Sequence, residues 1–294
     1  MVIPIVFTFD KRIVWGAAVA IKSLIDHANS STVYDIYVLH PDLSEQMIRD
    51  FERMIIPTKH KIQFQQISPA RFSGFPKNRG RWTEIVYYRM LIPDILPQYD
   101  KAIYSDVDVF FCEDMTEIYS MDIEDVHWGG VRAERNWPQA IGHQYYEENK
   151  KQFIFWSGFM LMNLKKMRSE NKLQDFFDVI HKHHDRLRLF DLEVLNIACE
   201  IKPVPFRYCT LETVYALDSL TECKEYPFLK HVYRDEELLE AKDKPAIIHY
   251  AGPLGKPWRR KRPPQYYKEY MDGVPQGLQK LTFRDIRKRF FSKR

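Results

Sequence analysis

Segments of strand length alternate with segments of helical spacing through the first 111 residues, and this alternation restricts the fold more than any other feature of the chain. The expected strands are residues 2–10, 33–40, 61–67 and 101–111, and the expected helices are residues 14–28, 42–56 and 82–96. Strands that alternate with helices at this spacing are typical of βαβ units with right-handed crossovers. We therefore predict an α/β fold with a mostly parallel sheet, in which ligands bind beyond the carboxyl ends of the strands.

The pattern after residue 125 is less regular but still predicts buried structure. Residues 153–167 are apolar with a Ser-Gly break, residues 170–184 have helical spacing, and residues 244–252 are typical of a buried strand. A chain of 294 residues with 45% hydrophobic residues can bury a sizeable core. We predict one domain over residues 1–262, followed by a separate basic segment over residues 263–294.

Cysteine usage and the absence of membrane signals indicate the compartment. The four cysteines, Cys112, Cys199, Cys209 and Cys223, show no C-x-x-C spacing, which is typical of free thiols in a reducing environment. The N-terminal residues MVIPIVFTFDKR lack the basic region and cleavage site of a signal peptide. No apolar run reaches the roughly 18 residues of a membrane-spanning helix. We therefore expect a cytoplasmic protein.

Two carboxylates interrupt the apolar segment KAIYSDVDVFF at residues 101–111. These are Asp106 and Asp108, and side chains two residues apart in a strand lie on the same face. Two carboxylates at so short a distance raise each other's pKa unless a cation lies between them. Oxygen ligands suit Mg²⁺ or Mn²⁺. The alternative is that the strand ends at Ser105 and that both acids lie in a solvated loop.

A histidine at the end of a later apolar segment is a second candidate ligand. His249 lies near the end of PAIIHY, which AGPLGKPW follows directly. A lone histidine at a strand end is more often structural, but imidazole suits Mn²⁺ better than Mg²⁺. Gly252 and Gly255 allow the backbone to approach a ligand closely, and Lys256 can neutralise a phosphate. A metal site beside a glycine turn and a lysine is what a nucleotide diphosphate requires.

Three further charged residues are candidates for the same site. Asp191 and Glu193 lie in LFDLEVLN, where Asp191 at a helix N-terminus is stabilised by the helix dipole. Plain N-terminal capping is the alternative for this pair. Arg89, in YYRML, can clamp a phosphate or can be a surface charge on a helix.

Six segments together resemble the retaining glycosyltransferases of family 8, a group with the GT-A fold. In chain order they are VFTFD, YYRML, YSDVDVFF, SGFMLMNLKKM, FDLEVLN and HYAGPLGKPW. The resemblance covers about residues 3–260, and the D-x-D followed by H-x-x-G-x-x-K-P-W is its most specific part. The group includes bacterial lipopolysaccharide galactosyl- and glucosyltransferases and glycogenin. The resemblance implies a Rossmann-like nucleotide-binding mixed sheet flanked by helices.

The resemblance also implies a UDP-sugar donor and a Mn²⁺ ion, with Mg²⁺ as the alternative. The implied metal ligands are Asp106, Asp108 and His249. The implied nucleotide-binding positions are Thr8, Asp10, Arg12 and Val107; the diphosphate positions are Arg89, Gly252 and Lys256; and the donor-sugar positions are Ser157, Gly158 and Asp191. The implied catalytic residues are Asp191 and Arg89.

Three departures from the family pattern affect the donor site. Arg12 and Ile13 stand where the family commonly has an Asn and a Tyr that stacks on uracil. Leu192 replaces the central Gln of D-Q-D, which argues against a catalytic role for this position. The Ser157-Gly158 pair replaces the commoner N-A, which removes an amide near the sugar hydroxyls. These departures leave a non-catalytic nucleotide-sugar binder as an alternative.

Basic residues are concentrated at the C-terminal end. Residues 256–294 hold 13 Lys and Arg against three acidic residues, whereas the other 255 residues hold 31 basic and 37 acidic residues. The last segment, LTFRDIRKRFFSKR, places Phe283, Phe290 and Phe291 among basic residues. Such a segment fits an anionic membrane surface; nucleic-acid binding and a disordered solubilising tail are the alternatives. The resemblance favours the inner face of the cytoplasmic membrane, and no nucleic-acid partner is expected.

The expected function is therefore Mn²⁺-dependent transfer of galactose or glucose from a UDP-sugar, with retention of the anomeric configuration. The expected acceptor is a lipid-linked oligosaccharide of a lipopolysaccharide or lipooligosaccharide core. The same chemistry on a protein or a soluble glycan is the alternative. The residue pattern carries no signal for a particular oligomeric state.

Overall fold

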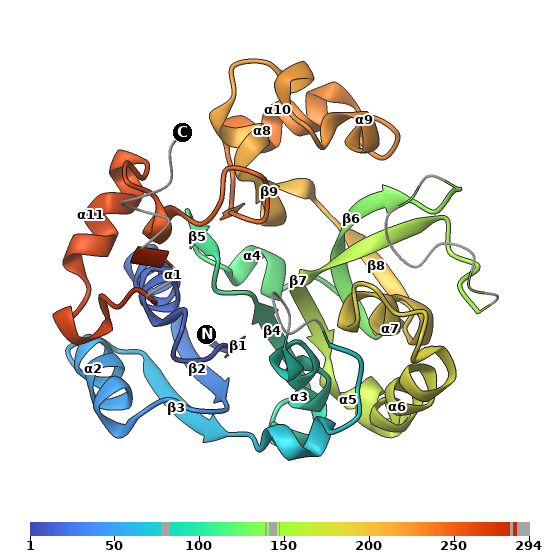
Figure 1. Cartoon of the computed structure of the whole chain (residues 1–294), viewed down its shortest axis with the longest axis horizontal. Coiled ribbons are helices and arrows are strands. Elements are labelled where there is room, and N and C mark those ends of the chain that lie inside the picture. The colour runs from blue at the N-terminus through green and yellow to red at the C-terminus, as the bar shows by residue number, and fades with distance from the viewer. Residues whose placement is uncertain (78–82, 139, 141–145, 147, 283–284, 287–294) are drawn as a thin grey trace.

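A central sheet with helices on both faces forms the body of the computed structural model (Figure 1). The structure describes residues 1–77, 83–138, 140, 146, 148–282 and 285–286. Among these residues, seven strands follow the order β3-β2-β1-β4-β7-β6-β8. They are β1 (Val2–Thr8), β2 (Val33–His40), β3 (Lys61–Gln66), β4 (Lys101–Ser105), β6 (Trp128–Arg135), β7 (Phe153–Asn163) and β8 (Ile201–Val204). The predicted α/β class is confirmed.

The sheet is mixed, with a parallel N-terminal half. Strand β1 pairs parallel with β2 and β4, and β2 pairs parallel with β3. Strand β7 is antiparallel to both β4 and β6, and β8 lies parallel to β6. Four of the six strand pairings in this sheet are parallel, so the prediction of a mostly parallel sheet is confirmed.

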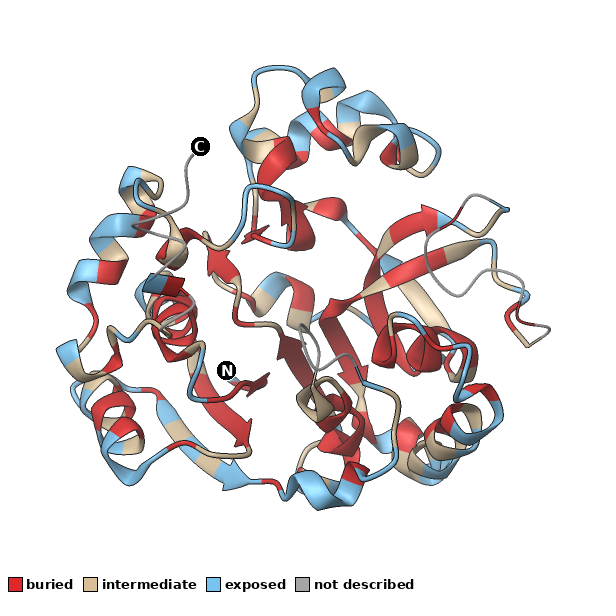
Figure 2. Ribbon diagram, in the orientation of Figure 1, coloured by how far each residue is buried: buried red, intermediate tan, exposed pale blue. Residues whose placement is uncertain are grey.

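Successive residues of the central strands enter two separate cores, one on each face of the sheet. On β1, Ile5 and Phe7 pack in one core and Val6 packs in the other. The first core is covered by α1 (Val14–Asp26) and α2 (Glu45–Ile55), and the second by α3 (Ile92–Ile95), α5 (Leu164–Ser169), α6 (Lys172–His183) and α7 (Asp191–Ala198). Figure 2 shows the buried strands between these helices. Burial on both faces explains why the strands are continuously apolar.

The predicted single strand over residues 101–111 is wrong. Strand β4 ends at Ser105, the chain leaves the sheet through residues 106–108, and β5 (Val109–Phe111) begins a second sheet. The order of this small sheet is β5-β10-β9, where β9 is Thr210–Leu211 and β10 is Ile247–His249. Two carboxylates inside a buried strand would lose their hydration without gaining partners, so the chain turns and carries them to the sheet edge.

The predicted helix over residues 82–96 is replaced by two shorter elements, and residue 82 itself lies outside the described residues. A 3₁₀ helix spans Glu84–Leu91, and α3 follows with Pro93 in its first turn. Proline lacks the N–H that a continuous α-helix would need at this point. The other described helices are α4 (Thr116–Tyr119), α8 (Glu212–Ala216), α9 (Tyr226–Leu229), α10 (Asp235–Asp243) and α11 (Gln265–Gly273).

The described residues beyond 262 pack onto the body, whereas Phe283, Phe290 and Phe291 of the predicted membrane-binding segment lie outside the described residues. Tyr267 and Met271 of α11 and the later Leu278 are buried in the same core as α1. Just before α11, Trp258 lies so close to α1 that a Cβ on Gly16 would meet its ring at 2.6 Å. The boundary predicted at residues 262 and 263 stays a prediction. None of the described helices is long and apolar enough to cross a membrane.

Candidate active site

Two neighbouring strands end together at the edge of the sheet and deliver acidic residues there. Strands β1 and β4 are parallel, with Phe7 opposite Ser105. Asp106 follows β4 directly, and Asp10 lies two residues after the end of β1. Because both strands point the same way, both acids lie at the carboxyl edge, as the sequence predicted.

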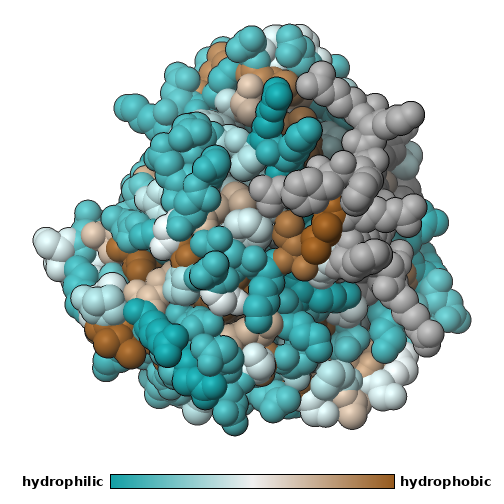
Figure 3. All heavy atoms as spheres, turned by 60° about the vertical axis from the view of Figure 1, so that its left-hand side comes forward, coloured by the Kyte–Doolittle hydropathy of each residue, from teal (hydrophilic) through white to brown (hydrophobic). Residues whose placement is uncertain are grey.

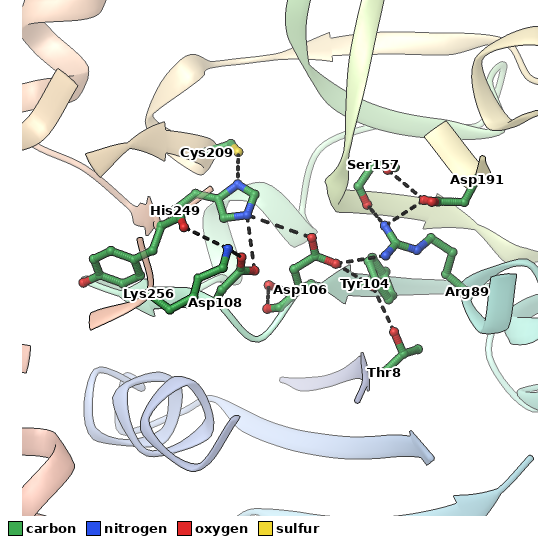
Figure 4. A network of polar contacts seen from close by, with 12 residues as sticks. Thr8, Arg89, Tyr104, Asp106, Asp108, Ser157, Asp191, Cys209, His249 and Lys256 are labelled. Atoms are coloured by element: carbon green, nitrogen blue, oxygen red, sulfur yellow. Dashed lines mark hydrogen bonds and ion pairs between the residues drawn. The ribbon is translucent and has the colours of Figure 1, made fainter. Parts of the chain in front are cut away.

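The antiparallel pairing of β5 with β10 brings His249 to the two carboxylates. His249 pairs with Val109, the residue that follows Asp108. Its Nε2 lies 3.4 Å from Asp108 Oδ1 and 3.9 Å from Asp106 Oδ2 (Figure 4). Side chains of all three residues are largely shielded, with exposed fractions of 28% for Asp106, 18% for Asp108 and 6% for His249. The acids are therefore neither in a strand nor in a solvated loop.

The three side chains fit a divalent ion. One donor atom from each lies within 4.8 Å of the others. The distances from His249 Nε2, 3.4 and 3.9 Å, fall within the roughly 3–4 Å that separates two ligands of one ion at about 2.1 Å. Gly158 provides the space, because a Cβ there would lie 2.9 Å from His249 Cε1 and 3.0 Å from Asp106 Oδ2. The Gly158 carbonyl also accepts the Asp106 N–H at 2.8 Å, which fixes the loop beside the site. Carboxylate oxygens with one imidazole suit Mn²⁺.

Lys256 adds a positive charge at the same place. Its ammonium donates to the Tyr250 carbonyl at 2.9 Å and contacts Asp108 Oδ2. Burial alone would raise the pKa of Asp108, but Lys256 and His249 outweigh it and hold that pKa well below its usual range. Burial would likewise lower the pKa of His249, but Cys209 and Asp108 raise it well above its usual value. Asp108 is therefore a carboxylate at all physiological pH values.

A buried arginine joins the metal-ligand loop to the residues predicted at the donor sugar. Arg89, at the end of the 3₁₀ helix, donates from Nη1 to the Ser157 carbonyl at 2.6 Å and from Nη2 to Asp106 Oδ1 at 3.0 Å. Nη1 also lies 3.2 Å from Asp191 Oδ2. Burial would lower the pKa of Arg89, but the surrounding acids raise it above its usual value. Arg89 is 5% exposed, so the alternative of a surface helix charge is excluded.

Asp191 is a buried carboxylate rather than a simple helix cap. Its Oδ2 accepts the Ser157 hydroxyl at 2.9 Å, and burial raises its pKa to about 6 although Arg89 opposes this shift. Capping is done by Glu193, whose Oε2 accepts the N–H groups of Arg188, Leu189 and Phe190 at 2.7–3.1 Å. These bonds hold Phe190 at a φ of 51°, a costly conformation for a bulky residue directly before Asp191.

Tyr104 is a site residue that sequence reasoning missed. Its hydroxyl lies 2.7 Å from Asp106 Oδ1 and 3.1 Å from Thr8 Oγ1, and the Arg89 guanidinium lies 4.3 Å from its ring centre. Burial raises the pKa of Tyr104 well above its usual value, so the hydroxyl stays neutral and donates to Asp106. Tyr104 precedes Asp106 by two residues, and this same-face spacing was the available signal.

The remaining predicted positions lie around this network and differ in the contacts that they make. Asp10 accepts the backbone N–H of Arg12 at 2.8 Å and its Nε–H at 2.6 Å, so these two residues form one pair. The Val107 side chain is buried in the core, which leaves its backbone to face a ligand. A Cβ on Gly252 would lie 3.3 Å from Thr213, so this turn is closely packed.

Comparison with known proteins agrees with this geometry. The sequence model described as glycosyl transferase family 8 matches residues 4–262. Among curated proteins, glycosyltransferase GlyA of Streptococcus pneumoniae serotype 4 is 26% identical over 239 residues, which are 81% of this chain and 30% of GlyA. Lipopolysaccharide 1,2-glucosyltransferase of Escherichia coli is 22% identical over 255 residues, with 85% of this chain and 71% of that protein covered. The chain thus spans under a third of GlyA and most of the second relative.

Solved structures show the same fold at low sequence identity. The galactosyltransferase LgtC, in complex with donor and acceptor sugar analogues, superposes with a TM-score of 0.75 at 22% identity, covering 94% of this chain and 98% of LgtC. The apo structure of the bifunctional glycosyltransferase WbbM gives a TM-score of 0.75 at 19% identity, covering 98% of this chain and 52% of WbbM. These likenesses confirm the predicted GT-A architecture. Since the family match covers most of the chain, the protein belongs to glycosyltransferase family 8 and is a glycosyltransferase.

Proposed function

We propose that this enzyme transfers a hexose, galactose or glucose, from a UDP-sugar to a lipopolysaccharide or lipooligosaccharide core with retention of configuration and with Mn²⁺ as cofactor. The observation that carries the proposal is the convergence of Asp106, Asp108 and His249 beside the cation Lys256. Mg²⁺ is the alternative ion, and the imidazole in the ligand set favours Mn²⁺.

The metal and two cations of the chain surround the expected diphosphate position. Asp106, Asp108 and His249 would hold the ion, which supplies Lewis-acid stabilisation of the negative charge on departing UDP. Lys256 and Arg89 place fixed positive charge around the same oxygens. Lys256 reaches the site from the loop after β10, and its contacts with Asp108 and the Tyr250 carbonyl keep it there.

Asp191 and its partners face the sugar in this proposal. The bond from the anomeric carbon to UDP breaks with oxocarbenium character, so a carboxylate beside the ring lowers the energy of the transition state. Asp191 is held for this role by the Ser157 hydroxyl and the Arg89 guanidinium. The acceptor hydroxyl oxygen then bonds to the anomeric carbon on the face that UDP leaves, its proton passes to the departing phosphate, and the configuration is retained.

The uracil and ribose would lie at the end of β1. Thr8 is tied to the network through Tyr104, and Asp10 is 5% exposed with its carboxylate bonded to Arg12. The Arg12 side chain is 50% exposed and has the planar guanidinium needed to stack on a base. This arginine can thus replace the aromatic residue that position 13 lacks.

The lipid-linked acceptor is supported by the E. coli relative, whose name states lipopolysaccharide as its substrate. Attachment to the membrane would use the basic C-terminal segment and anionic lipids. Figure 3 shows the side of the molecule that carries α11 and α2 as mostly hydrophilic, with hydrophobic atoms in small separate patches. This side thus offers no broad apolar face for deep insertion, so attachment at the inner face of the cytoplasmic membrane would depend on the basic segment.

Hydrolysis of the donor without an acceptor tests the proposal most directly. UDP-Gal, UDP-Glc, UDP-GlcNAc and UDP-GalNAc are each incubated with the protein and Mn²⁺, and UDP release is measured. We expect slow release from UDP-Gal or UDP-Glc, loss of it in EDTA, and loss of it in Asp108→Ala. Release that persists in EDTA or in this variant contradicts the metal assignment. UDP-sugar binding without any hydrolysis supports the non-catalytic binder instead.

A further inference from the structure

The thiol of Cys209 lies behind the His249 ring, on the side away from the two carboxylates (Figure 4). Its Sγ is 3.2 Å from Nδ1, while the opposite ring nitrogen Nε2 is 3.4 Å from Asp108 Oδ1. Cys209 is 1% exposed and His249 is 5% exposed, so water has little access to either group. The imidazole is therefore held between a thiol and the metal-ligand set.

The backbone fixes the distance between these two residues. Cys209 ends a 3₁₀ turn, Phe206–Cys209, that leads directly into β9. Strand β9 pairs with β10 in parallel, with Leu211 opposite His249. The Arg207 carbonyl of the turn accepts the Ala246 N–H at 2.9 Å, which ties the turn to the residue before β10. The thiol is thus positioned by the same small sheet that positions the histidine.

A histidine that ligates a metal through Nε2 carries its hydrogen on Nδ1, and this N–H needs an acceptor. Ligating histidines generally have such a partner, which fixes the tautomer and the ring orientation. A buried N–H without a partner loses its hydrogen bonds to water and gains none in return. In the described part of the chain, the contact of His249 Nδ1 is Cys209 Sγ, and a thiol sulfur can accept a weak hydrogen bond.

We infer that Cys209 is a positioning residue of the metal site, whose sulfur accepts the Nδ1–H of His249 and keeps the Nε2 lone pair directed at the ion. The inference rests on the proposed metal-dependent function. Cys209 is not itself a ligand, because the cluster of metal-ligating donor atoms among the described residues consists of Asp106, Asp108 and His249. Its role is exerted through the ring of His249.

Affinity for Mn²⁺ alone measures this role without any turnover. Free Mn²⁺ is quantified by its electron paramagnetic resonance signal in titrations of the wild type, Cys209→Ala and Cys209→Ser. We expect Cys209→Ala to bind Mn²⁺ about tenfold more weakly, as when an outer-shell partner is lost. Cys209→Ser keeps an acceptor and is expected within about threefold of the wild type. A purely structural effect of the missing sulfur would weaken both variants alike.

Two controls isolate the contact. In a His249→Ala background, Cys209→Ala is expected to change Mn²⁺ affinity no further, because the coupled partner is gone. Cys199 is equally buried, at 2% exposed, but packs in the other core. Cys199→Ala is therefore expected to lower the melting temperature while leaving Mn²⁺ affinity unchanged.

A measurement on the unchanged protein covers the case in which Cys209→Ala does not fold. With ¹⁵N-labelled histidine and Zn²⁺ as a diamagnetic probe, the His249 resonances, identified by their loss in His249→Asn, should show hydrogen on Nδ1. Hydrogen on Nε2 of the Zn²⁺-loaded protein overturns the inference, and so does a folded Cys209→Ala with wild-type Mn²⁺ affinity. A wild type that binds no Mn²⁺ refutes the proposed function instead.

Discussion

Arg89 and Asp106 form an ion pair, with Nη2 3.0 Å from Oδ1, that connects the metal-ligand loop to the sugar side of the site. The other terminal nitrogen of the same guanidinium donates to the Ser157 carbonyl and lies 3.2 Å from Asp191 Oδ2. One planar side chain therefore sets the distance between the candidate metal ligand Asp106 and Asp191, the carboxylate that we propose faces the sugar.

Replacing this arginine by lysine keeps the charge but removes the planar fork. A single ammonium cannot contact both Asp106 and Asp191. Arg89→Lys is therefore expected to lower the rate of UDP-sugar hydrolysis by about 100-fold. The matched control is Arg168→Lys, because Arg168 donates to the carbonyls of Pro93 and Tyr99 outside the site. The control should lose stability by denaturant titration and keep its activity; equal activity losses in both variants would contradict the role of Arg89.

The raised pKa of Asp191 predicts that activity and stability change in opposite directions with pH. Burial raises this pKa from 3.8 to about 6, so the folded state binds the proton more tightly than the unfolded chain does. This contribution to the free energy of unfolding is fully present below pH 3.8 and is lost as the pH rises through about 6. It amounts to at most about 3 kcal/mol.

Activity should fall as the pH drops below about 6, because protonated Asp191 has no negative charge with which to stabilise the positive charge of the transition state. Urea unfolding of the metal-free protein and hydrolysis rates between pH 4.5 and 7.5 test both trends. In Asp191→Asn the stability difference between pH 4.5 and 7.5 should shrink by about 2 kcal/mol, which is the part of this contribution that falls within that pH range. If the pH dependence of stability is unchanged in Asp191→Asn, a titratable group other than Asp191 causes it.

Gly158→Ala tests the space for the ion. The added Cβ would lie 2.9 Å from His249 Cε1 and 3.0 Å from Asp106 Oδ2, so one ligand must move. We expect Mn²⁺ affinity to fall by about tenfold or more. Gly129→Ala is the control, since its Cβ would meet the Val204 side chain at 3.0 Å in the core instead. The idea fails if Gly158→Ala binds Mn²⁺ as well as Gly129→Ala does.

Lys256→Met separates binding of the diphosphate from binding of the metal. The ammonium contacts Asp108 and accounts for much of the low pKa of that carboxylate. Its removal should weaken UDP binding by about tenfold or more in calorimetry, because a phosphate loses its point charge. Mn²⁺ affinity without nucleotide should not fall, because the competing cation at Asp108 is gone. Weaker Mn²⁺ binding together with normal UDP binding would mean that Lys256 supports the metal site and not the diphosphate.

Charge reversal in the C-terminal segment tests membrane attachment. The triple variant Arg287→Glu, Lys288→Glu, Arg289→Glu should lose flotation with vesicles that contain anionic lipid, because each basic residue contributes about 1 kcal/mol. Flotation of the unchanged protein should also weaken at high salt. Reversal of three exposed lysines on the body, Lys61, Lys224 and Lys230, keeps the net charge change equal and is the control. Equal losses in both variants would mean that the segment has no special role.

The sequence by itself determined the class of fold and named the candidate metal ligands. Alternation of apolar strands with amphipathic helices requires layers packed on both faces of a sheet, and this depends on local pattern alone. Asp106 and Asp108 are separated only by Val107, so their proximity needed no fold. His249 was a candidate from its place at a strand end, and the resemblance connected it with the two carboxylates, although it lies 141 positions after Asp108.

Only the tertiary structure decided how these residues meet. The chain leaves the main sheet at Ser105 because two carboxylates cannot be buried in the middle of a strand, and the second sheet then pairs Val109 with His249. The Cys209 contact and the bridging role of Arg89 arise from pairings between elements distant in sequence. Such contacts depend on the register of the strands and on how closely His249 and Asp106 approach Gly158. The residue pattern along one segment does not encode either of these.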